Sequence, residues 1–449
     1  MKLETDPDVR AAFEADASGL RMIPDAVARP RSAEEVAELL TDSSAAKRPV
    51  TPAGGQTSTT AASIVDAGVL LSLRSMNRII DIDIAGRIAR VEPGVMVGDL
   101  KRAVAEEGLT FAPDPTSEDE CTIGGSIACN ASGARTYKYG ATRGHVRALK
   151  VALANGDTIE PRRTDLEKNT VGYAFAHDPI DWFIGSEGTL GIIVEAELSL
   201  IPAPLQVTGL MIPFSSEGDA LAFVVAARES TDVSPRCIEF FGELALKIGR
   251  EADDQEGWGK DASAMVYVED ESPESLELWL ALADRSRALD DVRVFASDAE
   301  IRRARRIRHR VPSAMNERGS RGRDVGGRKV STDWAVPYRR LAEAIDIANR
   351  IADAHGVERA VVYGHAGNGH PHQNFIARDA DELRRIEEVV EETLREVLRM
   401  GGTVAAEHGI GKIKRKWLPL QMNAMQIGIM RAVKRELDPN GILAPGNIL

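Results

Sequence analysis

The sequence predicts an α+β protein with two domains. Between Pro49 and Pro202, short runs rich in β-branched residues alternate with clusters of Gly, Pro, Ser and Asn, which is the pattern of strands joined by tight turns. After the proline-containing break at 201–204, longer helical patterns alternate with strands. The length of 449 residues exceeds that of one ordinary domain. We expect a first domain at 1–203, a second at 204–433, and a C-terminal segment, 434–449, that docks back on the first.

The first half is expected to consist mostly of strands, with one short helix at 98–108. Apolar and polar residues alternate in its β-rich runs, as a half-buried sheet requires. These runs are 69–73, 78–83, 87–94, 148–160 and 191–200. In the second half, residues 381–400 show the apolar spacing of an amphipathic helix. The last segment is short, apolar and rich in turn residues, which predicts that it packs against the rest of the protein.

Composition and charge exclude several kinds of partner. Asp and Glu outnumber Lys and Arg by 69 to 56, so the net charge is −13 and an extended nucleic-acid surface is not expected. No apolar run reaches the ~20 residues that a membrane span needs. Three scattered cysteines cannot form a disulfide framework or a four-thiolate cluster. We expect a cytoplasmic protein that acts on a small molecule, with peripheral contact to the inner face of the membrane left open.

Three glycine-rich stretches occur in the first half, at 50–58 (VTPAGGQTS), 122–146 and 184–192 (IGSEGTLGI). Glycine allows backbone N–H groups to approach phosphate oxygens or a flat ligand closely. The first stretch matches neither the Gly-x-Gly-x-x-Gly spacing nor a Walker loop, and a single Gly-Gly pair is more often an ordinary turn. Three dense stretches within one domain favour a large cofactor.

These blocks resemble the PCMH-type FAD-binding domain of the vanillyl-alcohol-oxidase superfamily. The similarity lies in PVTPAGGQTS, PDPTSEDECTIGGSIACNASGARTYKYG and WFIGSEGTLGIIVEAELSL, and points to the branch of glycolate oxidase flavoprotein subunits, D-lactate dehydrogenases and D-2-hydroxyglutarate dehydrogenases. The resemblance implies an FAD-binding domain followed by an α+β substrate (cap) domain. It also implies that FAD is bound non-covalently, because the first loop lacks the histidine to which some members attach flavin.

The resemblance further implies which residues contact FAD. Those at the pyrophosphate are Gly54, Gly55, Gln56, Thr57 and Ser58, with Pro52 and Ala53 beside them. Those along the isoalloxazine and ribityl groups are Pro113, Asp114, Thr116, Gly124, Gly125, Ser126, Asn130 and Ser132. Those on the adenine side are Glu187, Gly188 and Ile193. The first loop departs from the commoner Gly-Gly-Gly-Thr-Ser at Gln56.

Three of the eight histidines fall in AVVYGHAGNGHPHQNFIA at 360–377. Two β-like runs around a Gly/Asn/Pro turn predict a hairpin with His365 and His372 on one face and His370 in the turn. A polar surface hairpin is the ordinary alternative. Downstream, the adjacent Glu407 and His408 stand in a glycine-rich segment, where they can supply one metal ligand and one base.

Both segments resemble paired motifs of the same family, Gly-His-x-Gly-Asp-Gly-Asn-x-His and Gly-Glu-His-Gly-Ile-Gly. The resemblance makes His365, His372 and Glu407 the ligands of a divalent metal and makes His408 the catalytic base. Zinc is the first expectation, and manganese or iron also suits two imidazoles and a carboxylate. The sequence departs from the family pattern at Asn368, where the family has Asp, and at His370, where it usually has Asn.

A run of six arginines occupies 301–310 (IRRARRIRHR), and most of them are expected on a solvated helix face. The resemblance implies that Arg308 binds the substrate carboxylate, which a planar guanidinium can hold through two hydrogen bonds. It implies that Lys329 is a second partner of that carboxylate.

Together these assignments imply FAD-dependent oxidation of a D-2-hydroxy acid to the 2-oxo acid, with a substrate of the D-lactate, glycolate or D-2-hydroxyglutarate class. The metal would activate the hydroxyl, His408 would take its proton, and hydride would pass to flavin N5. The expected electron acceptor is a quinone, a cytochrome or an electron-transfer flavoprotein, and the expected assembly is a homodimer or a glycolate-oxidase-like complex. Two alternatives stay open: a non-redox FAD transferase resembling alkylglycerone-phosphate synthase, and a flavoprotein subunit active only in a multi-subunit glycolate oxidase.

Overall fold

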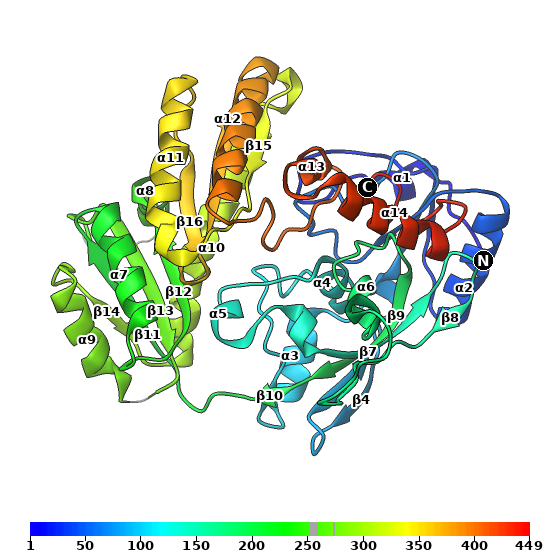
Figure 1. The fold of residues 1–449 in the computed structure, drawn as a ribbon, viewed down its shortest axis with the longest axis horizontal. Helices are drawn as coiled ribbons and strands as arrows, with labels where there is room; N and C mark the ends of the chain where they lie inside the picture. The colour runs from blue at the N-terminus through cyan, green and yellow to red at the C-terminus, as the bar shows by residue number, and fades with distance from the viewer. Residues whose placement is uncertain (252–258, 273) are drawn as a thin grey trace. The chain divides into compact units, whose positions relative to one another are not determined.

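A computed structural model describes residues 1–251, 259–272 and 274–449. The chain divides into two compact units, and both termini belong to the first (Figure 1). Unit 1 comprises residues 1–132, 140–203 and 407–449, and unit 2 comprises residues 133–139 and 204–406. Each unit combines helices with sheets, so the predicted α+β class is confirmed.

Unit 1 contains two main sheets and a short strand pair. Its strands are β1 (Ala26–Ala28), β2 (Val50–Ala53), β3 (Val69–Ser72), β4 (Ile79–Asp83), β5 (Ile88–Val91), β6 (Leu109–Thr110), β7 (Val146–Ala152), β8 (Thr158–Ile159), β9 (Ile192–Ser199) and β10 (Ile201–Pro202). A parallel sheet has the order β1-β3-β2, and an antiparallel sheet has the order β4-β5-β9-β7-β8. Every predicted run is found as strand, and the run at 148–160 forms two strands, β7 and β8, rather than one.

The helices of unit 1 are short. They are α1 (Pro7–Ala11), α2 (Ala33–Ala45), α3 (Val97–Ala105), α4 (Ile123–Cys129), α6 (Ile180–Phe183), α13 (Leu418–Gln421) and α14 (Ala424–Leu437). The helix predicted at 98–108 is α3. Leu100 of α3, Ile127 of α4 and Phe183 of α6 belong to one buried cluster with the inner face of the antiparallel sheet. This core holds the glycine-rich loops that precede and follow α4.

The C-terminal residues complete the parallel sheet of unit 1. Val50 of β2 donates its N–H to the Ile442 carbonyl at 2.8 Å, and its own carbonyl accepts from the Ala444 N–H at 2.8 Å. Leu443 is fully buried in the core between this sheet and α2. Residues from 407 onward belong to unit 1, so the second compact unit ends at Ala406 rather than at 433.

Unit 2 recruits a short segment from the first half of the chain. This segment, 133–139, contains helix α5 (Thr136–Tyr139). Arg135 donates to the Glu269 carboxylate at 3.1 Å, and Lys138 donates to that of Glu271 at 2.5 Å. These ion pairs explain why a piece of the second glycine-rich stretch belongs to the second unit.

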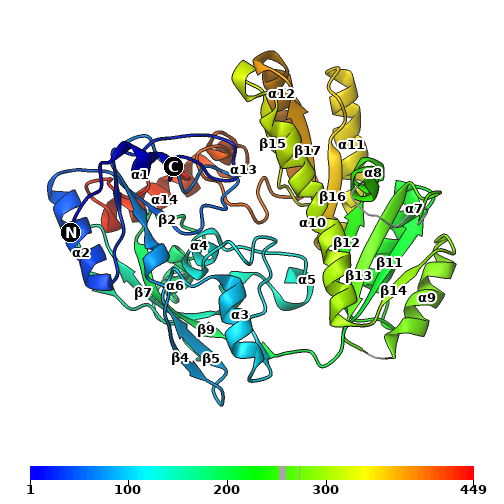
Figure 2. The ribbon, with the colours of Figure 1, turned by 180° about the vertical axis from the view of Figure 1, so that it is seen from behind.

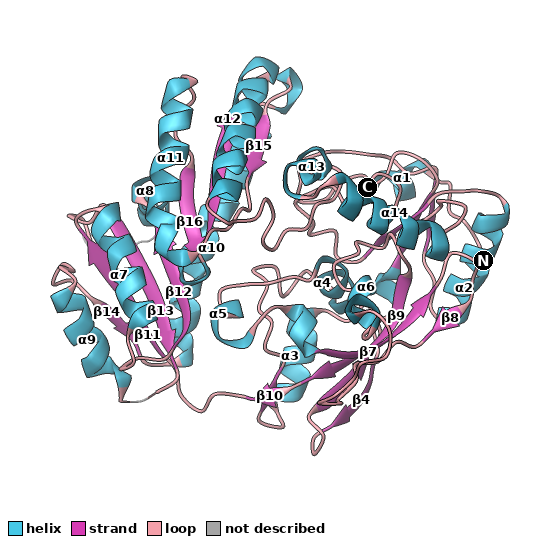
Figure 3. Cartoon of the chain, viewed as in Figure 1, coloured by secondary structure: helices cyan, strands magenta, loops and turns pink. Residues whose placement is uncertain are grey.

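Unit 2 is built on a seven-stranded antiparallel sheet of order β14-β11-β13-β12-β16-β17-β15 (Figure 3). The strands are β11 (Thr208–Phe214), β12 (Pro235–Phe241), β13 (Ala264–Asp270), β14 (Arg293–Phe295), β15 (Arg328–Ser331), β16 (Val361–His365) and β17 (His370–Ala377). The longer helices are α7 (Glu217–Glu229), α8 (Glu243–Glu251), α9 (Ser275–Arg285), α10 (Asp298–Ser320), α11 (Leu341–Ala354) and α12 (Ala380–Arg399). The helix predicted at 381–400 is α12. Within the described residues, no helix is long and apolar enough to cross a membrane.

Helices cover both faces of this sheet. On one face, α8 and α10 pack through a cluster that includes Ile248 and Ile307 (Figure 2). On the other face, Phe223 of α7 lies between Phe214 of β11 and Trp279 of α9, at ring distances of 5.3 and 6.2 Å. The sheet therefore provides a rigid frame for the histidines at the end of β16 and the start of β17.

Candidate functional site

The glycine-rich loops of unit 1 approach one another through their backbones. A Cβ atom on Gly54 would overlap the Thr122 side chain, and one on Gly55 would overlap the Glu120 carbonyl. A Cβ atom on Gly188 would overlap the Pro52 ring. A side chain is therefore excluded at these three glycines, where the loop presents only its peptide groups. Such a surface fits a pyrophosphate, which backbone N–H groups can cradle.

Gln56 replaces a glycine of the family pattern without placing its side chain in the loop. Its backbone is left-handed, with φ of 56°, a conformation that glycine adopts most easily. The side-chain amide donates to the carbonyls of Phe13 and Ala15 at 3.1 and 3.2 Å. The loop thus keeps the backbone conformation suited to glycine, and the longer side chain ties it to the N-terminal segment.

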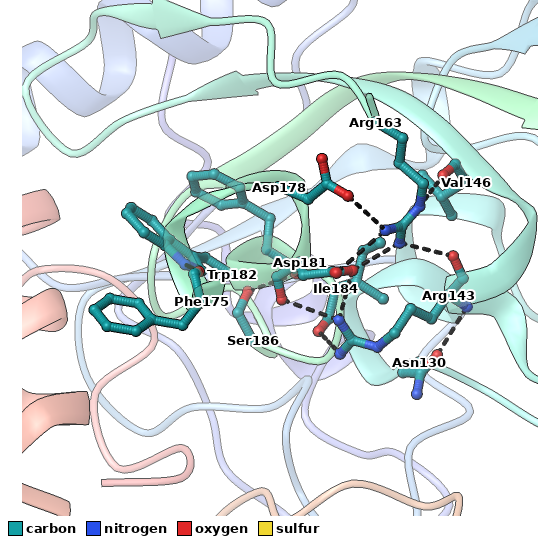
Figure 4. Close-up of polar contacts among 11 residues, drawn as sticks. Asn130, Arg143, Val146, Arg163, Phe175, Asp178, Asp181, Trp182, Ile184 and Ser186 are labelled. Atoms are coloured by element: carbon teal, nitrogen blue, oxygen red, sulfur yellow. Dashed lines mark hydrogen bonds and ion pairs between the residues drawn. The ribbon is translucent and has the colours of Figure 1, made fainter. Parts of the chain in front are cut away.

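An arginine–aspartate network joins the second and third loops (Figure 4). Asn130, left-handed at the end of α4, accepts from the Arg143 N–H at 2.9 Å. The Arg143 guanidinium donates to the Ile184 carbonyl and to Asp181, both at 2.8 Å. Arg163 donates to the same carboxylate at 2.6 Å. This network fixes Asn130 against the loop that contains Glu187.

Glu187 directs its carboxylate to the loop that follows His408. It accepts from the backbone N–H groups of Ile410 and Gly411 at 2.6 and 2.8 Å. Burial raises the pKa of Glu187, and these two donors offset only part of that effect. The Thr60 hydroxyl donates to the His408 carbonyl at 3.4 Å, so the loop after the proposed base is held from two sides.

The remaining residues expected at FAD lie in unit 1. Pro113 and Asp114 are buried after β6, whereas Thr116 is exposed. Gly124, Gly125 and Ser126 lie in α4, and Ser132 is the last residue before the segment that belongs to unit 2. Ile193 is in β9 and packs in the core, so only its backbone can reach a cofactor.

The histidine hairpin of unit 2 differs from the predicted one at its turn. The turn consists of 366–369, and His370 is the first residue of β17, directly opposite His365; His372 faces Tyr363. The prediction that His370 sits in the turn is therefore wrong. The ring centres of the three histidines are 4.8 to 5.3 Å apart, and all three side chains are buried.

His365 belongs to a buried network with Glu239 and Arg308. Its Nδ1 lies 2.6 Å from one oxygen of the Glu239 carboxylate, and Arg308 Nε donates to the other oxygen at 3.1 Å. The distance from Arg308 to His365 Nε2 is 3.3 Å. Burial acts to raise the pKa of Glu239, but His365 and Arg308 outweigh it and leave this pKa below its usual range. Glu239 was not predicted as a site residue, although an acid within the apolar run CIEFF is a visible signal.

His370 and His372 gather with two carboxylates. Asp333 Oδ1 lies 2.9 Å from His370 Nε2, and the Ala406 N–H donates to the Asp333 carbonyl at 2.7 Å. Glu407 is the next residue along the chain. One ligand atom each from Asp333, His370, His372 and Glu407 falls within 4.8 Å of the others, a set with the donor chemistry of zinc, manganese or iron sites.

Lys329 lies on β15 beside α10. Its ammonium donates to the Asn316 side chain, and desolvation lowers the pKa of Lys329 to about 8. Of the six arginines at 301–310, Arg308 is buried while Arg302, Arg306 and Arg310 are exposed, as a solvated helix face requires.

Comparison with known proteins agrees with this geometry. Residues 24–161 match the model of an FAD binding domain, and residues 204–448 match that of the FAD linked oxidases, C-terminal domain. The chain is 32% identical over 448 residues to glycolate oxidase subunit GlcD of Bacillus subtilis (strain 168), covering 98% of this chain and 92% of the relative. It is 31% identical to a D-lactate dehydrogenase of Anaerostipes hadrus, covering 95% and 89%.

Among solved structures, an alkyldihydroxyacetonephosphate synthase superposes with a TM-score of 0.74 at 18% identity, covering 99% of this chain and 83% of that one. At this identity the match concerns the fold alone. The fold, the family matches and the glycine-rich loops agree, and the chain belongs to the FAD-linked oxidase family of oxidoreductases, with a PCMH-type FAD-binding domain.

Proposed function

We propose that this protein oxidises a small D-2-hydroxy acid to the corresponding 2-oxo acid, with non-covalent FAD and a divalent metal. The observation that carries the proposal is the buried group of histidines and carboxylates in an FAD-linked oxidase. Relatives named glycolate oxidase subunit and D-lactate dehydrogenase support substrates of this class.

The proposed roles are those that the family resemblance implies, and the chemistry of each residue suits its role. Arg308 and Lys329 attract and orient the substrate carboxylate, with Glu239 fixing the direction of the Arg308 guanidinium. His408 takes the proton of the substrate hydroxyl. A bound divalent metal would lower the pKa of that hydroxyl, with His372 and Glu407 as proposed ligands and His365 as the third that the family resemblance implies. Bound FAD would accept the hydride from the substrate Cα.

We also propose the partners and the location that the sequence predicts. The electron acceptor is a quinone, a cytochrome or an electron-transfer flavoprotein, and the protein acts in the cytoplasm, as a homodimer or within a glycolate-oxidase-like complex. The name of the Bacillus relative as a subunit supports the complex.

Anaerobic mixing with a panel of D- and L-2-hydroxy acids tests this function. One D-acid should bleach the flavin without any added acceptor and should then reduce an artificial dye catalytically. A transferase would show neither result with any acid of the panel. Dye reduction that requires additional subunits would instead identify a component of a larger oxidase.

Acid denaturation should release the flavin into solution. No histidine stands in the first loop to form a covalent bond, and Gln56 directs its side chain to residues 13–15. Absorbance of the supernatant and of the precipitate after acid treatment measures the released fraction. Yellow colour that stays with the precipitate would contradict a non-covalent cofactor.

The KM for the hydroxy acid should rise above about pH 8. The pKa of Lys329 is lowered to about 8, so the ammonium loses its charge and its attraction for a carboxylate as the pH passes this value. Above it, KM can rise up to about tenfold per pH unit, because the protonated fraction falls tenfold per unit.

The substitution Lys329→Arg should remove this rise, because a guanidinium stays protonated in this range. The variant must be compared with the wild type because burial also lowers the pKa of Lys412 to about 8. A rise in KM that persists in Lys329→Arg would assign the titration to another group.

A further inference from the structure

The side chain of Asn447 joins the segments that follow the first glycine-rich stretch and form the third, all within unit 1. Its amide nitrogen donates to the Ala62 carbonyl at 2.9 Å and to the Glu187 carbonyl at 3.3 Å. Its oxygen accepts from the Lys412 ammonium at 2.8 Å. Asn447 is 2% exposed, and both N–H groups of its amide are engaged by backbone carbonyls.

Lys412 connects the same region to the loop that follows His408. Its ammonium also donates to the Ala61 carbonyl at 3.1 Å, and its backbone N–H donates to the Thr60 carbonyl at 3.0 Å. A Cβ atom on Gly411 would overlap the Thr60 carbonyl. The two loops therefore meet through their backbones, and the lysine side chain bridges them.

The C-terminal segment is docked on unit 1 by other contacts. Val50 of β2 exchanges backbone hydrogen bonds with Ile442 and Ala444. Lys434 of α14 donates to the Leu443 carbonyl at 2.8 Å. These contacts fix the segment without the Asn447 side chain, whose hydrogen bonds instead reach the loops expected at FAD.

The spacing of these loops matters for cofactor binding because they are rich in glycine. Glycine loses more backbone freedom on ordering than any other residue. Loops that already have the spacing of the bound state lose less entropy when the cofactor binds, so the affinity is higher. A side chain that holds both loops from outside the glycine-rich stretches provides this preorganisation.

We infer that Asn447 is a positioning residue for FAD and that, together with Lys412, it holds the first and third glycine-rich stretches at the spacing that the cofactor requires. The inference rests on the proposed function for its cofactor but needs no particular substrate. It assigns to the C-terminal segment a part in FAD binding that the motifs of the first domain do not reveal.

The test is dilution of the FAD-containing protein, in which the rise of free-flavin fluorescence gives the Kd for FAD. Asn447→Ala removes all three hydrogen bonds, whereas Asn447→Asp keeps the size and the acceptor for Lys412 but loses both amide donors. Asn440 lies in the same C-terminal segment and donates to the Ser44 hydroxyl at 2.9 Å, so Asn440→Ala is the matched control. Each Kd is measured at a temperature at which far-ultraviolet circular dichroism shows a folded protein.

Both Asn447 variants should raise the Kd for FAD at least about tenfold, the effect expected from the loss of two buried hydrogen bonds. Lys412→Met leaves the two amide donors of Asn447 in place and should cause a smaller rise, about threefold. Asn440→Ala should keep the wild-type Kd, although it also removes a hydrogen bond of the segment. Lys412→Met alters the fewest contacts of the clamp, so it decides the matter if an Asn447 variant does not fold.

A wild-type Kd in the folded Asn447 variants, or in Lys412→Met where neither of them folds, would overturn the inference. An equal rise in Asn440→Ala would also overturn it, because any loosening of the C-terminal segment would then release FAD. Failure of the proposed function is a separate result: a wild-type protein that retains FAD but whose flavin is not reduced by any hydroxy acid.

Discussion

His408→Asn should slow reduction of the flavin by substrate by about 10²–10⁴, the usual contribution of a general base, while FAD and metal remain bound. The side chain of His408 is 21% exposed, so an asparagine fits without a cavity in the core. The loop that follows is held by Glu187 and by Thr60 through backbone groups, which the substitution leaves in place. Stopped-flow measurement of flavin bleaching under anaerobic conditions gives the rate directly.

The substitution of the neighbouring residue, Glu407→Gln, should also slow flavin reduction, but through loss of the metal and not of the base. Its carboxylate oxygen lies 3.5 Å from His408 Nε2, but as a charged ligand it is expected to hold the metal. Metal content should therefore fall together with the bleaching rate in Glu407→Gln and stay constant in His408→Asn. Bleaching at the wild-type rate in His408→Asn would show that another residue is the base.

Local pattern was sufficient to predict most of the fold. The strands β3, β4, β5 and β9 and the helices α3 and α12 were predicted within a few residues, because each carries its own periodicity of apolar side chains. The limits of the compact units were not predictable in this way. Arg135 pairs with Glu269 across more than a hundred residues of sequence, and a tertiary ion pair of this kind leaves no local signal.

In the candidate site, too, local motifs were predictable from the sequence and tertiary partners were not. Motif spacing identified the histidines and the Glu407–His408 pair, since the chemistry needs those residue types. It could not identify their partners. Asp333 and Glu239 come from other strands and loops, and only the antiparallel register of the sheet places them against the histidines. The predicted position of His370 was wrong because the turn ends at Gly369 and His365 pairs with His370, a backbone register that the residue pattern does not reveal.

Gly55→Ala should strip the protein of FAD, although it adds only one methyl group. The new Cβ would overlap the carbonyl of Glu120, which is backbone and cannot rotate away as a side chain would. Either the first loop or the start of the second must move, and both are expected to present N–H groups to the cofactor. Overpacking of this kind costs about 1–3 kcal/mol of folding free energy, and valine at this position should be worse.

The matched control is Gly428→Ala in helix α14, where a Cβ meets no atom within 4 Å. That change should leave FAD bound and should stabilise the protein by up to about 1 kcal/mol, because alanine is the better helix former. FAD content by absorbance ratio and reconstitution of the FAD-free protein separate loss of the cofactor from loss of the fold. Only the two loops move in Gly55→Ala, so its FAD-free form should keep the wild-type far-ultraviolet circular dichroism while its affinity for added FAD falls. Stoichiometric FAD in purified Gly55→Ala would show that the close approach of Gly55 to Glu120 does not shape the cofactor site.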